Sequence, residues 1–485
     1  MTSREVERAA HAGEQDVRAP RDFSLLDNEN SATLSAAAVQ PVASVAFGSF
    51  ASGVALTIVT RLVMLVGTVG ASVIVARWLG PEGLGSLAVL NTTIVLALTL
   101  GSLGLTSSNT YFIAKDRRTV APVWANTIVF ALCGGTLVAT VVVALAKFKP
   151  LLFGGVSPDL IVIAAVSLPF QFLLSLGLNV LLSMDRIRQM NLLDAMAPAL
   201  ALFNAILVLL VSGSTLKVLV SFNTAATVVL SVAMLWTVRR LFARQKESWP
   251  FRPNAELFKA AIGYGLRFFI PLMAATLIFR FDLLIVNHFR GAAEAGVYAV
   301  ASQVANLLTM LPGVIAMLLF PRVASYQDPR AEFAIQVTRH VTFVMLIMCG
   351  VVAAGSFLLP LIYGARFADA TIQLLILLPG ICLIGIESVL VQHFTGTGLP
   401  LAIPLFWLIT LAVSLGLNLA LVPLFGARGA AVTSTISYAL IFLFVAVYFC
   451  LKTGRRPIEI FLLRGREFRN LLVQAHLASP TKAHE

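Results

Sequence analysis

The chain has 485 residues, of which 58% are hydrophobic and 12% are charged, and its formal net charge is +12. A soluble domain contains about 45–50% apolar and about 25% charged residues, so this composition excludes an ordinary soluble enzyme and requires the lipid bilayer as the surrounding medium. The basic residues lie mainly in short gaps between apolar runs. That is the pattern of cytoplasmic loops and not of a nucleic-acid-binding surface, so we expect no nucleic acid as a partner.

The N-terminal segment differs from the rest of the chain. Residues 1–41 contain four Arg, seven acidic residues and no long apolar run. A secretory signal would have an apolar stretch directly after a basic start, and polar segments of this kind do not build a core. We predict a disordered cytoplasmic tail over residues 1–50.

Apolar segments long enough to cross a membrane fill most of the remaining chain. A membrane helix needs about 20 mostly apolar residues, and twelve segments qualify. Their approximate limits are 52–76, 86–112, 120–146, 158–183, 190–212, 216–238, 260–288, 294–321, 338–362, 370–395, 400–422 and 427–450. The predicted fold class is an all-α polytopic membrane protein with about 12 transmembrane helices.

The distribution of Lys and Arg predicts the orientation in the membrane. With the N-terminus inside, twenty basic residues lie in the inner gaps and just after the last span, against seven in the outer gaps. Cytoplasmic loops are enriched in Lys and Arg. We therefore predict a multi-pass protein of a bacterial inner membrane with both termini in the cytoplasm.

A long basic gap divides the spans into six plus six, and a faint internal repeat supports that division. In the segments around Gly80 and Gly291, Gly80 aligns with Gly291 and Gly85 with Gly296. A second trace aligns Asn204 with Asn418. Since six is even, the halves would be parallel repeats. The predicted domains are the N-terminal six-helix bundle 51–238, the cytoplasmic linker 239–259, the C-terminal six-helix bundle 260–452, and the cytoplasmic tail 453–485 with an interfacial helix or a frayed end.

Motifs of enzymes and cofactors are absent from the sequence. It contains no G-x-x-x-x-G-K-[ST], no H-E-x-x-H and no C-x-x-C. Its four cysteines, each inside an apolar run, fit small packing residues better than a disulfide or a zinc site. We expect no catalytic residue, no metal and no cofactor.

Two loop segments carry a family resemblance. Ala71–Ala88 contains the run Ala-Arg-Trp-Leu-Gly-Pro-Glu-Gly-Leu-Gly, and Phe281–Gly291 is followed by Ala295-Gly-Val-Tyr-Ala-Val-Ala301. Both resemble the polysaccharide-transporter (Wzx-type) family, over roughly residues 50–450. The resemblance implies a V-shaped pair of bundles around a central cavity, with lipid II flippases and drug/cation antiporters as relatives.

The resemblance also implies a function and partners. It predicts a flippase that moves a polyprenyl-pyrophosphate-linked glycan from the cytoplasmic to the periplasmic leaflet for surface polysaccharide (exopolysaccharide, capsule or O-antigen) assembly. Membrane lipids, a polymerase and other assembly proteins would be its partners. The alternatives are an ion-coupled antiporter of cationic drugs, which needs a cavity dominated by acids, and a membrane glycan polymerase, against which the short outer gaps argue.

Ionisable groups inside a span are costly and are candidates for function. Arg61, about 13 Å into the first span, either faces the cavity or snorkels to the interface. Arg280 is a candidate phosphate contact, because the guanidinium fork matches phosphate oxygens. Asp282 is a candidate ion-coupling site, and the alternative for both residues is an interhelical ion pair. Arg267 is either a first contact for the pyrophosphate or an interface anchor.

The remaining candidates are neutral amides and one carboxylate. Gln303 and Asn306 are three residues apart on one helical face, where they either bind sugar hydroxyls or join helices. Glu387 follows a full turn of apolar residues. It either couples transport to an ion gradient or pairs with an arginine such as Arg280.

Overall fold

The structure is a computed structural model, which describes residues 47–211, 215–244, 252–315, 331–396 and 400–461. The side chains of residues 47–58, 151–152, 244 and 267–268 also lie outside the described set. The contacts divide the chain into two units, Met1–Leu56 and Thr57–Glu485, and the second contains nearly all of the described residues. Most of the predicted N-terminal tail, part of the linker and most of the C-terminal tail fall outside the described residues.

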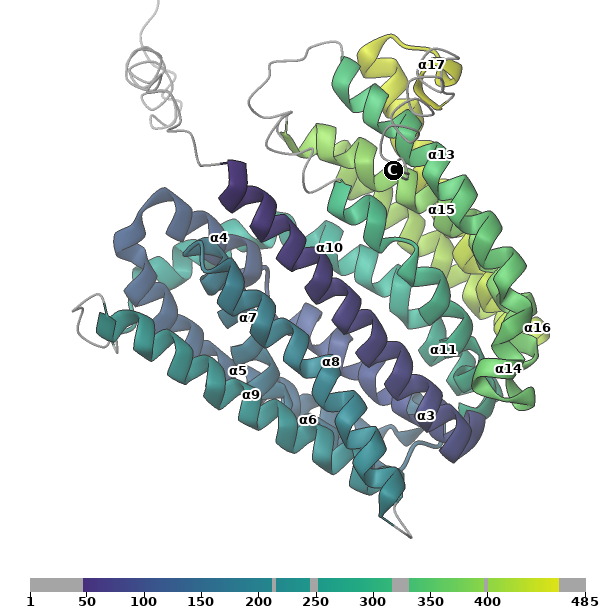
Figure 1. The fold of residues 1–485 in the computed structure, drawn as a ribbon, viewed down its shortest axis with the longest axis horizontal. Helices are drawn as coiled ribbons and strands as arrows, with labels where there is room; N and C mark the ends of the chain where they lie inside the picture. The colour runs from purple at the N-terminus through teal and green to yellow at the C-terminus, as the bar shows by residue number, and fades with distance from the viewer. Residues whose placement is uncertain (1–46, 212–214, 245–251, 316–330, 397–399, 462–485) are drawn as a thin grey trace, which may run out of the picture. The chain divides into compact units, whose positions relative to one another are not determined.

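Every regular element in the described ranges is a helix (Figure 1). The helices of the first half are α3 (Phe47–Gly101), α4 (Leu105–Lys115), η1 (Arg117–Thr119), α5 (Val120–Phe148), η2 (Pro150–Phe153), α6 (Pro158–Val166), α7 (Leu168–Ser183), α8 (Ile187–Leu210) and α9 (Leu216–Arg244). Those of the second half are α10 (Ala255–Arg290), α11 (Ala292–Leu307), α13 (Glu332–Gly355), η3 (Ser356–Leu358), α14 (Leu359–Tyr363), η4 (Ala365–Phe367), α15 (Asp369–Gly396), α16 (Ala402–Thr453) and α17 (Pro457–Phe461).

Among the described residues, nine helices are long and apolar enough to cross a membrane, or ten if the bent pair α6 and α7 forms one span. This count does not establish the predicted twelve. Two helices are longer than one span requires, because α3 has 55 residues and α16 has 52, and a span needs about 20. Each contains one glycine with a positive φ, Gly80 at 68° and Gly426 at 59°, where two helical segments meet at a kink.

The helix α10 connects the two halves of the chain. It packs on α11 and α16 of the second half and on α4, α5 and η2 of the first. Near its start the Tyr264 ring stacks on Tyr111 at 4.2 Å. Near its end the Asn287 side-chain amide donates to the Phe153 carbonyl at 2.7 Å.

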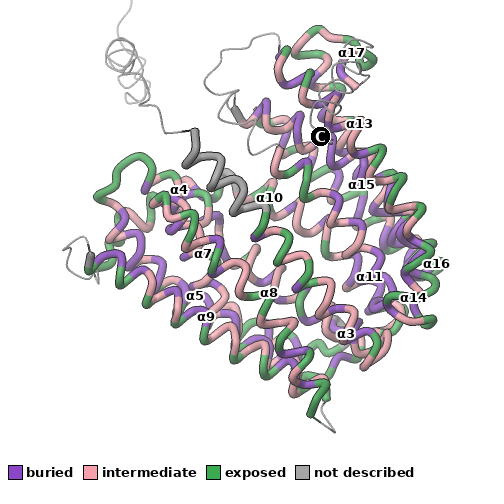
Figure 2. The backbone as a smooth tube through the Cα atoms, in the orientation of Figure 1, coloured by how far each residue is buried: buried purple, intermediate pink, exposed green. Residues whose placement is uncertain are grey.

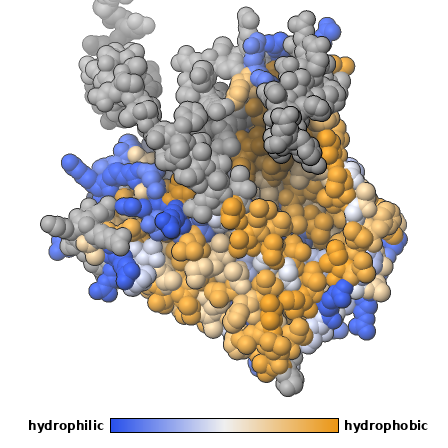
Figure 3. Space-filling view, viewed as in Figure 1, coloured by the Kyte–Doolittle hydropathy of each residue, from blue (hydrophilic) through white to orange (hydrophobic). Residues whose placement is uncertain are grey.

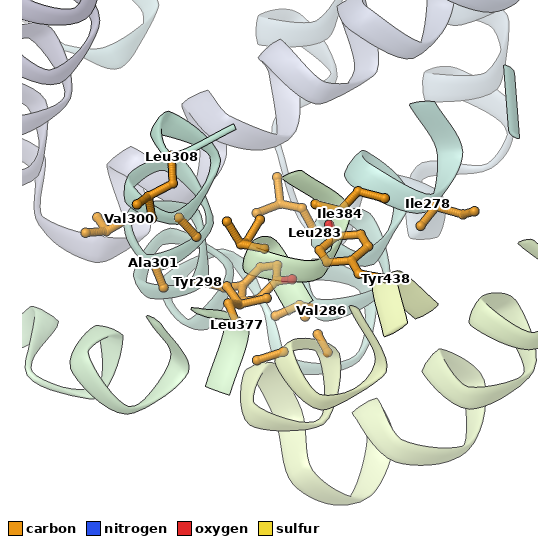
Figure 4. Close-up of a cluster of buried hydrophobic side chains, with 14 of the residues drawn as sticks. Ile278, Leu283, Val286, Tyr298, Val300, Ala301, Leu308, Leu377, Ile384 and Tyr438 are labelled. Atoms are coloured by element: carbon orange, nitrogen blue, oxygen red, sulfur yellow. The ribbon is translucent and has the colours of Figure 1, made fainter. Parts of the chain in front are cut away.

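Buried apolar side chains of α10, α11, α15 and α16 form the core around this helix (Figures 2 and 4). Tyr298 of α11, Leu377 of α15 and Tyr438 of α16 belong to it and are at most 3% exposed. Long apolar faces allow this packing, because helices that are hydrophobic all round can bury one side and leave the other in lipid.

Large hydrophobic side chains also cover the outside of the molecule. Val229 on α9, Val351 on α13 and Leu443 on α16 are more than half exposed. Figure 3 shows hydrophobic residues over much of the described part of the visible face, with hydrophilic patches toward its borders. An apolar surface of this extent is stable only in lipid, so the chain is a multi-pass membrane protein.

Candidate functional site

A cavity of about 380 Å³ with both polar and apolar lining lies between helices of the first half and α11 of the second. We call it the amide pocket, because four side-chain amides line it, each from a different helix: Asn91 of α3, Gln171 of α7, Asn223 of α9 and Gln303 of α11. Hydroxyl groups and apolar side chains, including alanines, valines and leucines, form the rest of the wall. None of its described lining residues is Asp, Glu, Lys, Arg or His.

Gln303 is the one predicted site residue that lines the amide pocket. Its Nε2 donates to Ser72 Oγ on α3 at 3.2 Å, and Ser72 Oγ lies 3.2 Å from the hydroxyl of Tyr363 on α14. The side chain therefore links the two halves, as one sequence interpretation expected, and also contacts the cavity; binding of sugar hydroxyls stays a prediction. Asn306, one turn further along α11, is half-buried, does not line the pocket and forms no side-chain hydrogen bond with the described residues.

The Arg61 guanidinium forms an ion pair with Asp194 of α8, with Nη1 3.3 Å from Oδ2. The two side chains are 41% and 27% exposed, so the pair borders open space. Sequence reasoning missed Asp194. The available signal was an acidic residue about two turns into an otherwise mostly apolar helix, where it needs a partner.

Asp282 is 4% exposed and lies in a hydrogen-bonded cluster of three helices. Its Oδ2 accepts from the Tyr298 hydroxyl of α11 and from Ser434 Oγ of α16, the latter at 2.9 Å. Its Oδ1 accepts from the Leu283 backbone amide at 2.7 Å. These partners satisfy the hydrogen bonds of a buried carboxylate. Arg280 forms no direct ion pair with it among the described residues, but the positive charge of Arg280 acts on the carboxylate through space.

Arg280 is exposed about halfway along the membrane-spanning part of α10, and it has no hydrogen-bond or ion-pair partner among the described residues. Glu387 of α15 has the opposite surroundings. It is 3% exposed, and its Oε1 has no hydrogen-bond partner among the described residues. The two do not pair with each other. Arg267 lies in α10, and its side chain is outside the described set.

A second cavity, of about 670 Å³, lies between the halves and is almost wholly apolar. Its wall comes from α3, α5, η2, α10 and one residue of α16, and Thr93 and His288 are its polar members. None of the predicted site residues lines it. Its chemistry suits a hydrocarbon chain, whereas the polar groups gather in the amide pocket.

Solved structures of membrane transporters share this fold. "Lipid II flippase MurJ, inward closed conformation" superimposes with a TM-score of 0.70 at 14% identity, covering 88% of this chain and 93% of that one. An inward-facing multidrug resistance MATE family transporter of the MOP superfamily gives 0.63 at 14% identity, covering 82% and 99%. A MOP superfamily transporter from Pyrococcus furiosus, titled for the reversed polarity of its binding pocket, gives 0.54 at 14% identity, covering 82% and 94%.

No curated protein sequence matches the chain. Residues 49–327, more than half of the chain, match the family described as "Polysaccharide biosynthesis protein". The structural neighbours are transporters and flippases, and at this level of identity they establish the fold alone. The chain therefore belongs to the polysaccharide biosynthesis protein family and has the fold of the MOP superfamily transporters.

Proposed function

We propose that the protein is a flippase for polyprenyl-pyrophosphate-linked oligosaccharides, which it moves from the cytoplasmic to the periplasmic leaflet of a bacterial inner membrane. The family match supports a place in polysaccharide biosynthesis, and the fold supports membrane transport. The substrate class rests on the charges inside the membrane.

The observation that carries the proposal is the contrast between exposed cations and buried acids at membrane depth. Arg280 is exposed and forms no hydrogen bond or direct ion pair with the described residues, although its charge acts through space on the buried Asp282. Because such a charge is costly in lipid, it faces water or substrate in this proposal. Asp282 and Glu387 are 4% and 3% exposed. In this proposal Arg280 supplies the positive charge of the accessible wall, which suits a pyrophosphate.

The same contrast disfavours an antiporter of cationic drugs. Such a transporter needs an accessible carboxylate. Asp194 is more exposed than Asp282 and Glu387, but its charge is neutralised by Arg61 at 3.3 Å. The apolar cavity of about 670 Å³ offers a place for the lipid tail while the headgroup stays in a polar environment. Alternating access of the two halves moves the headgroup in this proposal, and Glu387 or Asp282 couples the movement to an ion gradient.

The test is transport of a lipid-linked oligosaccharide in proteoliposomes that contain the full chain. We expect Arg280→Ala and Arg61→Ala each to reduce transport by about tenfold, because each lost charge-assisted contact is worth about 1.5–3 kcal/mol. Arg280→Lys keeps the charge and should restore part of the rate. Arg252→Ala, an exposed arginine before the start of α10, is the matched control and should transport normally.

Two results would contradict the proposal. One is parental transport by both the Arg280→Ala and the Arg61→Ala variant. The other is efflux of a cationic dye by the parent protein with no transport of the lipid-linked oligosaccharide, which would favour the antiporter. In cells that express either arginine variant at the parental level, we expect a loss of surface polysaccharide, which would support the same function in vivo.

A further inference from the structure

We propose that the amide pocket is the saccharide compartment of the transporter, and that α11 is its removable wall. The inference rests on the proposed function and adds to it the place of the sugar and the residues that hold it. Those residues are Asn91, Gln171, Asn223 and Gln303, of which the sequence singled out Gln303 alone.

The hydrogen-bonding capacity of the four amides exceeds what the protein uses. Gln171 Nε2 donates to Ser167 Oγ at 2.9 Å, and Gln303 Nε2 donates to Ser72 Oγ at 3.2 Å, which leaves both amide oxygens without a described partner. Asn223 Oδ1 accepts from Asn204 at 3.0 Å, which leaves the Nδ2 of Asn223 without a described partner. The amide of Asn91 forms no side-chain hydrogen bond with the described residues.

This pattern of donors and acceptors matches sugar hydroxyls. Each hydroxyl both donates and accepts, and an amide offers two donors and one acceptor oxygen. A cation or a phosphate would find no counter-charge in the pocket, whose described lining is neutral, and burying an unpaired charge is costly. The chemistry of the pocket therefore selects a neutral polar ligand.

The size of the pocket limits how much of the substrate it holds. Alanines recur around its wall and create the space: Ala71, Ala88, Ala164, Ala197, Ala201, Ala205, Ala226 and Ala299. At about 380 Å³ it lies near the lower end of the range for small-molecule sites, about 300–1,000 Å³. The pocket therefore takes a small part of the oligosaccharide, and the rest of the repeat unit stays outside.

The pocket and the Arg61–Asp194 ion pair lie along the same two helices. Thr68 of α3 and Pro198 of α8 line the pocket. Arg61 precedes Thr68 by seven residues, about 10 Å along a helix, and Asp194 precedes Pro198 by about one turn. A sugar in the pocket would thus leave the pyrophosphate to which it is attached near the guanidinium of Arg61.

One wall of the pocket belongs to the other half of the chain. Ala299 and Gln303 of α11 are the lining residues from the second half, and all others come from the first. They share a helical face with Gly296, which packs directly against Gly85 of α3. The face that closes the pocket is therefore the face through which the halves touch, and separation of the halves would open it.

The test compares two probes on the purified full chain in nanodiscs: farnesyl pyrophosphate that carries one N-acetylglucosamine, and bare farnesyl pyrophosphate. The variants are Asn91→Leu and Gln171→Met, which keep the side-chain size and remove the amide. We expect each to weaken binding of the sugar-bearing probe about fivefold, the value of one hydrogen bond of about 1 kcal/mol, and to leave binding of the bare probe unchanged.

The control is Asn179→Leu on α7. Its amide donates to Ser175 within the same helix at 2.8 Å and does not line the pocket, so the variant should bind both probes as the parent does. If the amide variants bind both probes normally, or bind both with equally reduced affinity, the pocket is not the saccharide compartment. A parent protein that binds neither probe would instead overturn the proposed function.

A separate experiment tests whether α11 moves away from the amide pocket. In a variant with the four native cysteines replaced, a cysteine introduced at Ala88 in the pocket should react with a water-soluble maleimide. We expect the sugar-bearing probe to slow this reaction several-fold and the bare probe to leave it unchanged. We expect Gly296→Leu, which forces the halves apart, to accelerate it. Equal protection by the two probes, or no acceleration by Gly296→Leu, would contradict the proposal.

Discussion

Gly85 of α3 and Gly296 of α11 pack back to back at the contact between the two halves of the chain. A Cβ at Gly85 would lie 1.7 Å from the Ala292 carbonyl oxygen and 2.8 Å from the Gly296 nitrogen. A Cβ at Gly296 would lie 2.0 Å from the Pro81 carbonyl oxygen and 2.9 Å from the Gly85 nitrogen. Backbone thus meets backbone at both positions, and only glycine fits there.

The contact is reciprocal, as a contact between two repeats related by a two-fold axis would be. The aligned segments pair Gly80 with Gly291, and the same offset pairs Pro81 with Ala292 and Gly85 with Gly296. Gly85 lies against Ala292 and Gly296 lies against Pro81, and Pro81 and Ala292 are themselves an aligned pair. This agreement fits a two-fold relation between the two aligned segments, and the parallel orientation of the whole repeats stays a prediction.

Alanine at either glycine should separate the halves at this contact. We expect Gly85→Ala and Gly296→Ala each to lower the free energy of unfolding by about 1–3 kcal/mol through overpacking, measured by thermal unfolding in detergent. Gly350→Ala on α13, where a Cβ would meet nothing within 4 Å, is the control and should be neutral or stabilising. An alanine at Gly85 as well tolerated as that at Gly350 would show that the contact is not close.

The Arg61–Asp194 pair should compete with an anionic substrate. We expect Asp194→Asn to strengthen binding of bare farnesyl pyrophosphate about fivefold, because a half-exposed ion pair is worth up to about 1 kcal/mol, and Arg61→Ala to weaken it. The measurement is equilibrium binding in nanodiscs. Arg188→Ala, an exposed position on α8, serves as the control. Weaker binding by Asp194→Asn would mean that Asp194 holds the guanidinium in place instead.

The hydrogen bonds of Asp282 should contribute to stability. Tyr298→Phe removes the hydroxyl that donates to the buried carboxylate, and we expect it to lower the free energy of unfolding by about 1–3 kcal/mol. Tyr448→Phe is the matched control, because that hydroxyl forms no hydrogen bond with the described residues, and it should change stability by less than about 0.5 kcal/mol. Equal effects of the two variants in thermal unfolding would remove the stabilising role of the cluster.

Glu387 should matter for coupling and not for folding. Gln has the shape of Glu and carries no charge, so Glu387→Gln should fold at least as well as the parent. We expect it to reduce the stimulation of transport by a pH gradient across proteoliposomes several-fold. Glu256→Gln, at the exposed start of α10, is the control. Stimulation that is unchanged in the Glu387 variant would exclude coupling through this residue.

Several properties of the protein could be predicted from residues alone. The apolar composition determined the membrane class, because exposed hydrocarbon is stable only in lipid, and the helical fold followed, because backbone groups in lipid must be satisfied within the helix. The loop motifs pointed to the family that the match over residues 49–327 then established. The number of spans stays a prediction, since α3 and α16 each consist of two helical segments that meet at a kink, at Gly80 and at Gly426.

Only the tertiary structure decided which of these residues meet. Asp194 pairs with Arg61 across 133 positions of sequence, and Ser434 reaches Asp282 across 152. The four amides of the pocket come from four helices. Sequence periodicity gives the face of a helix on which a residue lies, but nearly every face here is apolar, so hydrophobicity cannot say which face turns to which neighbour. The rotation and packing of whole helices set those partners, and the close approach at Gly85 and Gly296 shows where the two halves meet.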